Sequence, residues 1–376
     1  MYFGDKMLKR YRVRDYDFKL VIFLISIATI GVLIVGSAAK EFQSKQLTGL
    51  IVGVFLMVVI SLFDYSFFLQ FYWLIYIVNL IILLLVRFAG VEVNNAKRWL
   101  EIAGIQFQPS ETAKILLILF FSQYIMKHKD TLNTFKTLAS CVILLLPPLI
   151  LIYKQPDLST SIMIVILFCA ILFIGGLSYK IIGTTFAIVV PLLVVFLVLV
   201  LQPDQKLINP YQQTRILAWL HPLEYANSAG YQQDNSITAI GSGQLFGKGY
   251  NNNVISSVKN GNFISEPQTD FIFAIVGEEL GFVGGSIVIV LLTLISLECI
   301  LIARRAKDLA GTLICTGMAT LVGCQGFINI SVATGIMPNT GIPLPFVSYG
   351  LTSLVSVFIG MGFVLNISLQ CVRKYS

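Results

Sequence analysis

The sequence is poor in charge and in the residues from which metal centres are commonly built. Only 12% of its 376 residues are charged, and histidine occurs twice, at His128 and His221. Its six cysteines show no CxxC spacing, which excludes a recognisable zinc site or disulfide framework. The glycine-rich stretch AIGSGQLFGKG at 239–249 lacks the GxxxxGK[ST] pattern, so the phosphate loop of a nucleotide-binding protein is excluded as well.

Long apolar runs are what the chain has in abundance. Hydrophobic residues make up 56% of it, against about 45–50% in soluble domains. The runs are continuous rather than alternating, so they predict helices and not the strands of a barrel. We therefore expect an all-α polytopic membrane protein, with residues 1–376 forming a single membrane domain. Ten spans are predicted, at 18–39, 46–63, 71–88, 111–126, 136–153, 158–177, 181–202, 271–303, 309–334 and 350–371.

The basic residues favour one orientation in the membrane. Before or at the start of the first predicted span stand Lys6, Lys9, Arg10, Arg12, Arg14 and Lys19. The positive-inside rule places this segment in the cytoplasm, and an even number of spans returns the C-terminus to the same side. The formal net charge of +7 then reflects topology and contact with anionic membrane lipid, and nucleic acid is not an expected partner.

In this orientation the long polar segment 203–270, between the seventh and eighth spans, lies outside the cytoplasm. It far exceeds the usual connection length of about 4–6 residues, so we expect a functional extracytoplasmic loop. Residues 96–107 (AKRWLEIAGIQF) also lie outside and are expected at the membrane surface. Three prolines in PNTGIPLPFVSYG at 338–350 exclude a regular helix there and predict a rigid loop.

The stretch EPQTDFIFAIVGEELG at 266–281 places four carboxylates at the start of an apolar span. As one straight helix, the segment from Asp270 to Ala303 would measure about 50 Å, against about 30 Å of hydrocarbon. Its first turns should therefore lie above the hydrocarbon or line a wet cavity. Asp270 is either a helix cap or a functional acid, Glu266 and Glu278 are its expected electrostatic neighbours, and Glu279 is expected to be structural.

Other polar residues each have a functional and a structural interpretation. Lys114, one turn inside a span and three residues from Glu111, is a cation for an anionic ligand, a snorkelling lysine or half of a structural pair. Asp157 begins a span and fits a helix cap on local grounds. Arg98 and Arg215 lie in outer segments, where a lone arginine is usually solvated.

Eight motifs in order resemble the SEDS family (shape, elongation, division and sporulation), whose members include RodA and FtsW. They are NNAKRW at 94–99, FQPSETAK at 107–114, QPDLST at 155–160, YQQTRI at 211–216, GYQQDNS at 230–236, AIGSGQLFGKG at 239–249, EPQTDFIFAIVGEELG at 266–281 and GIPLPFVSYG at 341–350. FQPSE and GIPLP look more like RodA than FtsW. One departure is Gln268, which stands where the family often has histidine.

The resemblance implies ten transmembrane helices in the bacterial cytoplasmic membrane and polymerisation of lipid II into glycan strands at its outer face. It implies a class B penicillin-binding protein as partner, and Asp270 as the catalytic residue. An elongation role is expected, with the division and sporulation roles left open.

That reaction suits the candidate residues. A sugar 4-hydroxyl must lose a proton to a general base, for which we expect Asp270. The pyrophosphate leaving group requires positive charge, for which Lys114, Arg98 and Arg215 are candidates. The carboxylates Glu111, Asp157 and Glu266 would orient these cations or hold Mg²⁺ or Mn²⁺. The alternatives are a lipid II flippase or another transporter, and a scaffold that only docks a transpeptidase.

Overall fold

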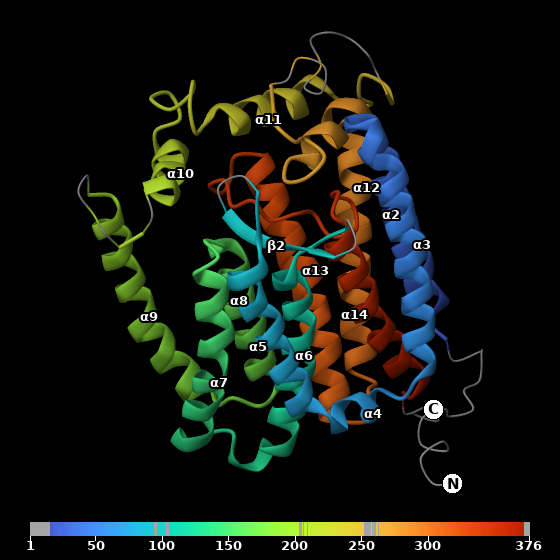
Figure 1. Cartoon of the computed structure of the whole chain (residues 1–376), viewed down its shortest axis with the longest axis vertical. Coiled ribbons are helices and arrows are strands. Elements are labelled where there is room, and N and C mark those ends of the chain that lie inside the picture. The colour runs from blue at the N-terminus through green and yellow to red at the C-terminus, as the bar shows by residue number, and fades with distance from the viewer. Residues whose placement is uncertain are drawn as a thin grey trace.

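The computed structural model describes residues 16–93, 96–102, 105–202, 205, 207–208, 210–251, 257, 261 and 263–371. The basic residues at 6–14 and the asparagines of NNAKRW lie outside these ranges. Helices dominate the described residues (Figure 1): α2 (Phe18–Ala38), α3 (Lys40–Leu62), α4 (Tyr65–Gln70), α5 (Tyr72–Ala89), α6 (Pro109–Lys127), the short 3₁₀ helix η2 (Lys129–Thr131), α7 (Phe135–Tyr153), α8 (Leu158–Ile174), α9 (Tyr179–Val200), α10 (Pro210–Leu220), α11 (Tyr231–Ser242), α12 (Ile272–Ala303), α13 (Leu309–Ala333) and α14 (Leu351–Leu369).

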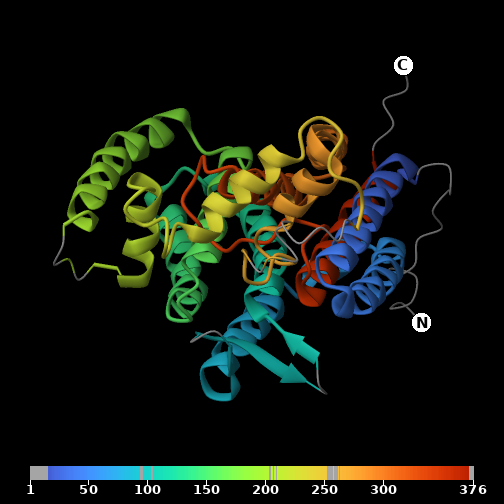
Figure 2. The same ribbon diagram turned by 90° about the horizontal axis from the view of Figure 1, so that it is seen from above.

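Helices α13 and α14 form the centre of the bundle. Helix α13 packs against α12, α6 and α8, and α14 packs against α3. Glycines allow the α3–α14 contact to be close, since a Cβ on Gly362 would lie 2.8 Å from the Met57 carbonyl oxygen. Helix α9 is the opposite case: none of its apolar span is buried, and it stands apart from the bundle (Figures 1 and 2). Its exposed valine, leucine and phenylalanine side chains suit contact with lipid.

Eight of the described helices are long and apolar enough to cross a membrane, namely α2, α3, α5, α7, α9, α12, α13 and α14. The chain is therefore a multi-pass membrane protein. Helix α8 is apolar but has only 17 residues. Helix α6 carries Glu111, Lys114 and Lys127 and is not among the eight. Helices coincide with all ten predicted spans, and the count of ten membrane crossings stays a prediction.

A small antiparallel sheet makes the fold mostly helical rather than all-α. Its strands are β1 (Val91–Val93), β2 (Ala96–Ile102) and β3 (Ile105–Phe107), in the order β1-β2-β3. Figure 2 shows the sheet at one edge of the molecule. In the register, Leu100 lies opposite Phe107 and Glu101 opposite Gln106. Leu100 is buried and Glu101 exposed, an alternation over too few residues to stand out in a chain dominated by apolar helices.

Helix α12 is not one straight helix, which corrects the length estimate from the sequence. Gly281 has φ 64° and ψ −162°, outside the helical region, so the chain breaks there. The glycine-rich stretch 239–249 surrounds the break. Four backbone hydrogen bonds of 2.8–3.1 Å join residues 244–249 to residues 278–283, two in each direction. The stretch thus satisfies backbone groups that the broken helix leaves unpaired, as buried backbone requires.

The described residues between α9 and α12 include the helices α10 and α11, both of which contact the bundle or its loops. Helix α11 packs against α12 and α13. Gln233 of α11 donates from Nε2 to the carbonyl groups of Val332 (2.8 Å) and Met337 (2.7 Å). The Trp219 indole in α10 donates to the Gly335 carbonyl (3.0 Å). These side chains thus bind carbonyl groups at and just after the C-terminal end of α13, where a helix leaves carbonyl groups without intrahelical partners.

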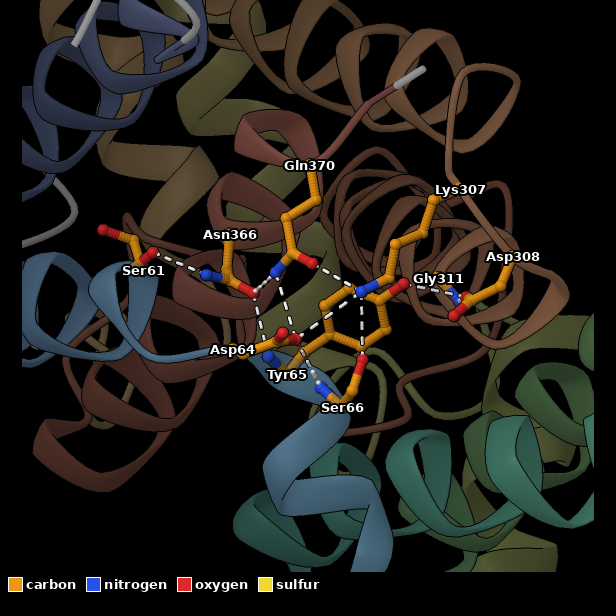
Figure 3. A network of polar contacts seen from close by, with 9 residues as sticks. All are labelled: Ser61, Asp64, Tyr65, Ser66, Lys307, Asp308, Gly311, Asn366 and Gln370. Atoms are coloured by element: carbon orange, nitrogen blue, oxygen red, sulfur yellow. Dashed lines mark hydrogen bonds and ion pairs between the residues drawn. The ribbon is translucent and has the colours of Figure 1, made fainter. Parts of the chain in front are cut away.

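A polar network closes the opposite end of the bundle (Figure 3). Lys307 Nζ lies 3.6 Å from Asp64 Oδ1 and donates to Gln370 Oε1 (2.5 Å). Gln370 Nε2 donates to Asp64 (3.1 Å) and to Asn366 Oδ1 (2.8 Å), which also accepts from the Tyr65 backbone N–H (2.9 Å). The network joins the turn before α4, the α12–α13 loop and the end of α14.

Candidate active site

The backbone just before α12 is held by the rest of the protein. The carbonyl groups of residues 268–270 accept, in order, from Tyr349 N (2.8 Å), Ser348 Oγ (2.6 Å) and Asn329 Nδ2 (2.8 Å). The first two donors belong to the proline-rich loop 338–350 and the third to α13. The main chain that carries Asp270 is therefore fixed between this loop and the central helix.

The Asp270 carboxylate is not a helix cap. The N-cap residue of α12 is Phe271, and no side chain caps that end. Instead the carboxylate faces Gly341 of the proline-rich loop: a Cβ on Gly341 would lie 3.3 Å from Asp270 Oδ2 and 3.7 Å from Arg215 Nη1. Gly341 has φ +73°, a conformation that suits glycine. The carboxylate and the guanidinium thus adjoin the same backbone position.

Four predicted site residues act electrostatically on Asp270. Burial raises the pKa of its carboxyl to about 6, the largest effect. The positive charges of Arg215 and Arg98 lower that pKa, whereas the negative charges of Glu266 and Asp157 raise it. Segments distant in the sequence (β2, α8, α10 and the start of α12) therefore converge on one carboxyl group, which suits a group that must titrate near neutral pH.

Arg98 and Asp157 are held by local contacts. Arg98 donates from Nε to the Gln155 carbonyl (3.0 Å) and from Nη2 to the Pro156 carbonyl. Asp157 is the N-cap of α8, as the local pattern predicted, and accepts from the Thr160 backbone N–H (3.1 Å). Arg98 thus binds two carbonyl groups of the turn that leads into α8, next to Asp157, which caps that helix.

Arg215 is half-buried rather than free in solvent. It projects from α10 and donates from Nη1 to the Asn339 carbonyl (3.4 Å). This contact ties the outer helix α10 to the proline-rich loop beside Gly341.

Glu111 and Lys114 form a buried pair, 4% and 2% exposed, on the first turns of α6. Lys114 Nζ donates to Glu111 Oε1 (2.8 Å) and to Gln325 Oε1 (2.9 Å). Ser353 Oγ donates to the other oxygen of Glu111 (2.6 Å). The Gln325 amide in turn donates to the Pro343 carbonyl (3.0 Å), so the pair reaches the proline-rich loop through one side chain.

Gln325 and Asn329 contact the site but are not among the residues predicted from the sequence. They stand four residues apart in GCQGFINIS of α13, both essentially fully buried. Two amides at this spacing on an apolar membrane helix are the sequence pattern that could have predicted them, because buried polar groups in a membrane helix require partners.

The remaining carboxylates of the stretch 266–281 lie in other contacts. Glu278 pairs with Lys248 at 2.9 Å, so its charge partner is in the glycine-rich stretch and not at Asp270. Glu279 accepts from Ser37 Oγ (2.5 Å) and from the Asn251 backbone N–H (3.3 Å). These contacts of Glu279 are of the structural kind that the sequence predicts for it.

The described residues do not form a ready-made metal site. They contain no group of three or more histidine, cysteine, aspartate or glutamate side chains placed to hold an ion. Both oxygens of Glu111 and both of Asp157 are engaged by Lys, Ser or Thr side chains or by backbone N–H groups. Mg²⁺ or Mn²⁺ stays a prediction, and no step below depends on it.

Residues 16–372 match the family of cell cycle proteins that comprises FtsW, RodA and SpoVE. The chain is 32% identical over 358 residues to the peptidoglycan glycosyltransferase MrdB of Escherichia coli strain K12, covering 93% of each chain. It resembles the crystal structure of the rod shape determining protein RodA of Thermus thermophilus at 26% identity and a TM-score of 0.69, covering 96% of this chain and 98% of that one.

A further similar structure comes from a study on the structural coordination of polymerization and crosslinking by a peptidoglycan synthase complex. The identity is 27% and the TM-score 0.77, covering 94% of this chain and 97% of the other. The likeness therefore spans the whole bundle and the docked outer helices.

Proposed function

Since the chain belongs to the FtsW, RodA and SpoVE family of cell cycle proteins, we propose that it polymerises lipid II with Asp270 as the general base. It is a peptidoglycan glycosyltransferase, as the relative MrdB is named. The family match over residues 16–372 supports the reaction class, and the surroundings of Asp270 support the residue assignment.

One observation carries the assignment. Asp270 is the carboxylate on which two arginines and two further carboxylates act, and it does not cap the helix that follows it. A buried carboxyl with a pKa of about 6 accepts a proton more readily than an ordinary aspartate and is still ionised at neutral pH.

In the proposed reaction Asp270 takes the proton from the 4-hydroxyl of one sugar as its oxygen attacks the anomeric carbon of another. The bond between that carbon and the pyrophosphate oxygen breaks, and the α linkage becomes β. Arg215 and Arg98 stabilise the negative charge that develops on the leaving pyrophosphate. Glu266 and Asp157 orient these cations, and the buried Glu111–Lys114 pair contributes through Gln325 and the proline-rich loop.

The proposal places this site outside the cytoplasm, with ten spans, both termini inside and segment 203–270 as the extracytoplasmic loop. The α6–α7 connection carries Lys127, Lys129 and Lys136, and the α12–α13 loop carries Arg304, Arg305 and Lys307. Both connections lie at the end of the bundle away from α10 and α11, which supports this orientation (Figure 1). The likeness to MrdB and to a rod shape determining protein supports an elongation role. A class B penicillin-binding protein as partner is supported by the likeness to a chain of a complex that polymerises and crosslinks.

The test is polymerisation of labelled lipid II by the purified protein in detergent. We expect glycan strands from the wild type and a loss of at least about 10²-fold with Asp270→Asn, because the base is removed while the side-chain volume is kept. Asp130→Asn, at an exposed position of η2, is the matched control and should keep wild-type activity.

Two results would contradict the proposal. Equal polymerisation by the wild type and Asp270→Asn would show that Asp270 is not the base. Transfer of lipid II across a liposome bilayer without any polymer would instead favour a flippase.

A further inference from the structure

Two amide side chains of α13 hold consecutive carbonyl groups of the proline-rich loop. Asn329 Nδ2 donates to the Ile342 carbonyl (2.7 Å), and Gln325 Nε2 donates to the Pro343 carbonyl (3.0 Å). Pro343 and Pro345 have no N–H group, so this loop cannot pair its backbone as a strand or helix would. The carbonyl groups of Ile342 and Pro343 accept from these side chains instead.

Asn329 also holds the backbone of Asp270. The same Nδ2 atom donates to the Asp270 carbonyl at 2.8 Å, so both hydrogens of one amide are used on two different chain segments. Its Oδ1 atom is buried and has no hydrogen-bond partner among the described residues.

The two segments that Asn329 joins are the ones that meet at the carboxylate. Asp270 Oδ2 and Arg215 Nη1 both adjoin Gly341, the residue before Ile342. Arg215 itself donates to Asn339 of the same loop. A shift of the loop relative to the start of α12 would therefore move the carboxylate away from the guanidinium.

Gln325 extends this support to α6. Its Oε1 atom accepts from Lys114, which is paired with Glu111, so the amide cannot rotate without breaking a buried contact. The orientation that directs Nε2 at the Pro343 carbonyl is thus set by a charged pair on a neighbouring helix.

We propose that Asn329 is a positioning residue that fixes the Asp270 carboxylate against Gly341 and Arg215, with Gln325 as its support one turn earlier on α13. This inference rests on the proposed function, since it assumes that Asp270 performs the chemistry. Neither amide is assigned to contact the sugar or the pyrophosphate.

The experiment measures lipid II polymerisation, its pH profile and the melting temperature for Asn329→Ala. Misplacement of a reacting group by about 1 Å costs about 10²-fold, so we expect kcat to fall by that order while KM changes little. The pH at which activity is half lost should move upward, because Asp270 loses the influence of Arg215. Gln325→Met, which keeps the side-chain length, should lower kcat less and provides a second variant if Asn329→Ala does not fold.

Asn366→Ala is the matched control. Asn366 is equally buried and equally engaged, with the Ser61 carbonyl, the Tyr65 N–H and Gln370, but lies in the network of Figure 3 at the other end of the bundle. It should lower the melting temperature and leave kcat per folded molecule and the pH profile unchanged.

The inference is overturned if Asn329→Ala and Gln325→Met behave like Asn366→Ala in both kcat and pH profile. If in that case the wild type still polymerises and Asp270→Asn does not, the inference alone has failed and the proposed function stands. If the wild type and Asp270→Asn do not differ, the proposed function has failed and the inference falls with it.

Discussion

At the scale of single residues, the site is defined by how opposing charges act on Asp270. Burial and the carboxylates of Glu266 and Asp157 raise its pKa, and two arginines lower it. A raised carboxyl pKa means that the folded state binds the proton more tightly than the unfolded state. The stabilisation from the protonated form is therefore lost as pH rises from the ordinary 3.8 through about 6. Near neutral pH the ionised carboxylate therefore lowers the free energy of unfolding, and the proposed role as a base requires this ionised form.

The pH dependence of polymerisation tests this balance. Because the base must be ionised, activity should fall as pH drops through about 6. Glu266→Gln removes a charge that raises the Asp270 pKa, so the loss of activity should move to lower pH. Arg215→Gln removes a charge that lowers it, so the loss should move to higher pH. Profiles of kcat against pH for the three proteins provide the measurement, and shifts in one common direction would contradict the charge assignment.

At the scale of elements, the break in α12 explains a glycine-rich motif that the sequence left without a role. The stretch 239–249 pairs with the backbone on both sides of Gly281. Close approach requires the glycines, since a Cβ on Gly247 would lie 2.1 Å from the Glu279 carbonyl oxygen. The same pairing fixes the short first part of α12 that follows Asp270.

Gly281→Ala tests this contact. Its φ and ψ lie in a region that is essentially restricted to glycine, so alanine there should cost about 1–3 kcal/mol. The added Cβ would also lie 2.3 Å from Gly247 N. Gly241→Ala in α11 is the control, because no atom lies within 4 Å of its Cβ position. Melting temperatures in detergent should fall for Gly281→Ala and stay level or rise for Gly241→Ala. A melting temperature of Gly281→Ala equal to that of the wild type would show that the break does not require glycine.

At the scale of the whole molecule, the proposed active site and the Lys307 network occupy opposite ends of one bundle. The Asp270 site lies among α10, the sheet and the proline-rich loop, whereas the Lys307 network joins the turn before α4, the α12–α13 loop and the end of α14 (Figures 1 and 3). Damage at the second end should therefore reduce the folded fraction without altering the reaction.

Asp64→Ala tests this separation. Asp64 caps α4 through the Ser66 N–H (2.9 Å), accepts from Gln370 (3.1 Å) and pairs with Lys307. Loss of these contacts should cost about 1–3 kcal/mol and lower the melting temperature. The rate of lipid II polymerisation per folded molecule should equal that of the wild type. A fall in that rate with an unchanged melting temperature would show that the two ends are coupled.

The sequence by itself determined the class of protein and the positions of the long helices, and it supplied most of the candidate site residues. Apolar runs predict the class and the helices because transfer into a bilayer depends on local composition. The motifs that carry the family resemblance are also local in the sequence. Only the tertiary structure decided that Asp270 does not cap α12, that Glu278 pairs with Lys248, that α12 breaks at Gly281 and that residues 91–93, 96–102 and 105–107 form strands. It alone revealed Gln325 and Asn329, since their partners lie in segments that only folding brings to α13.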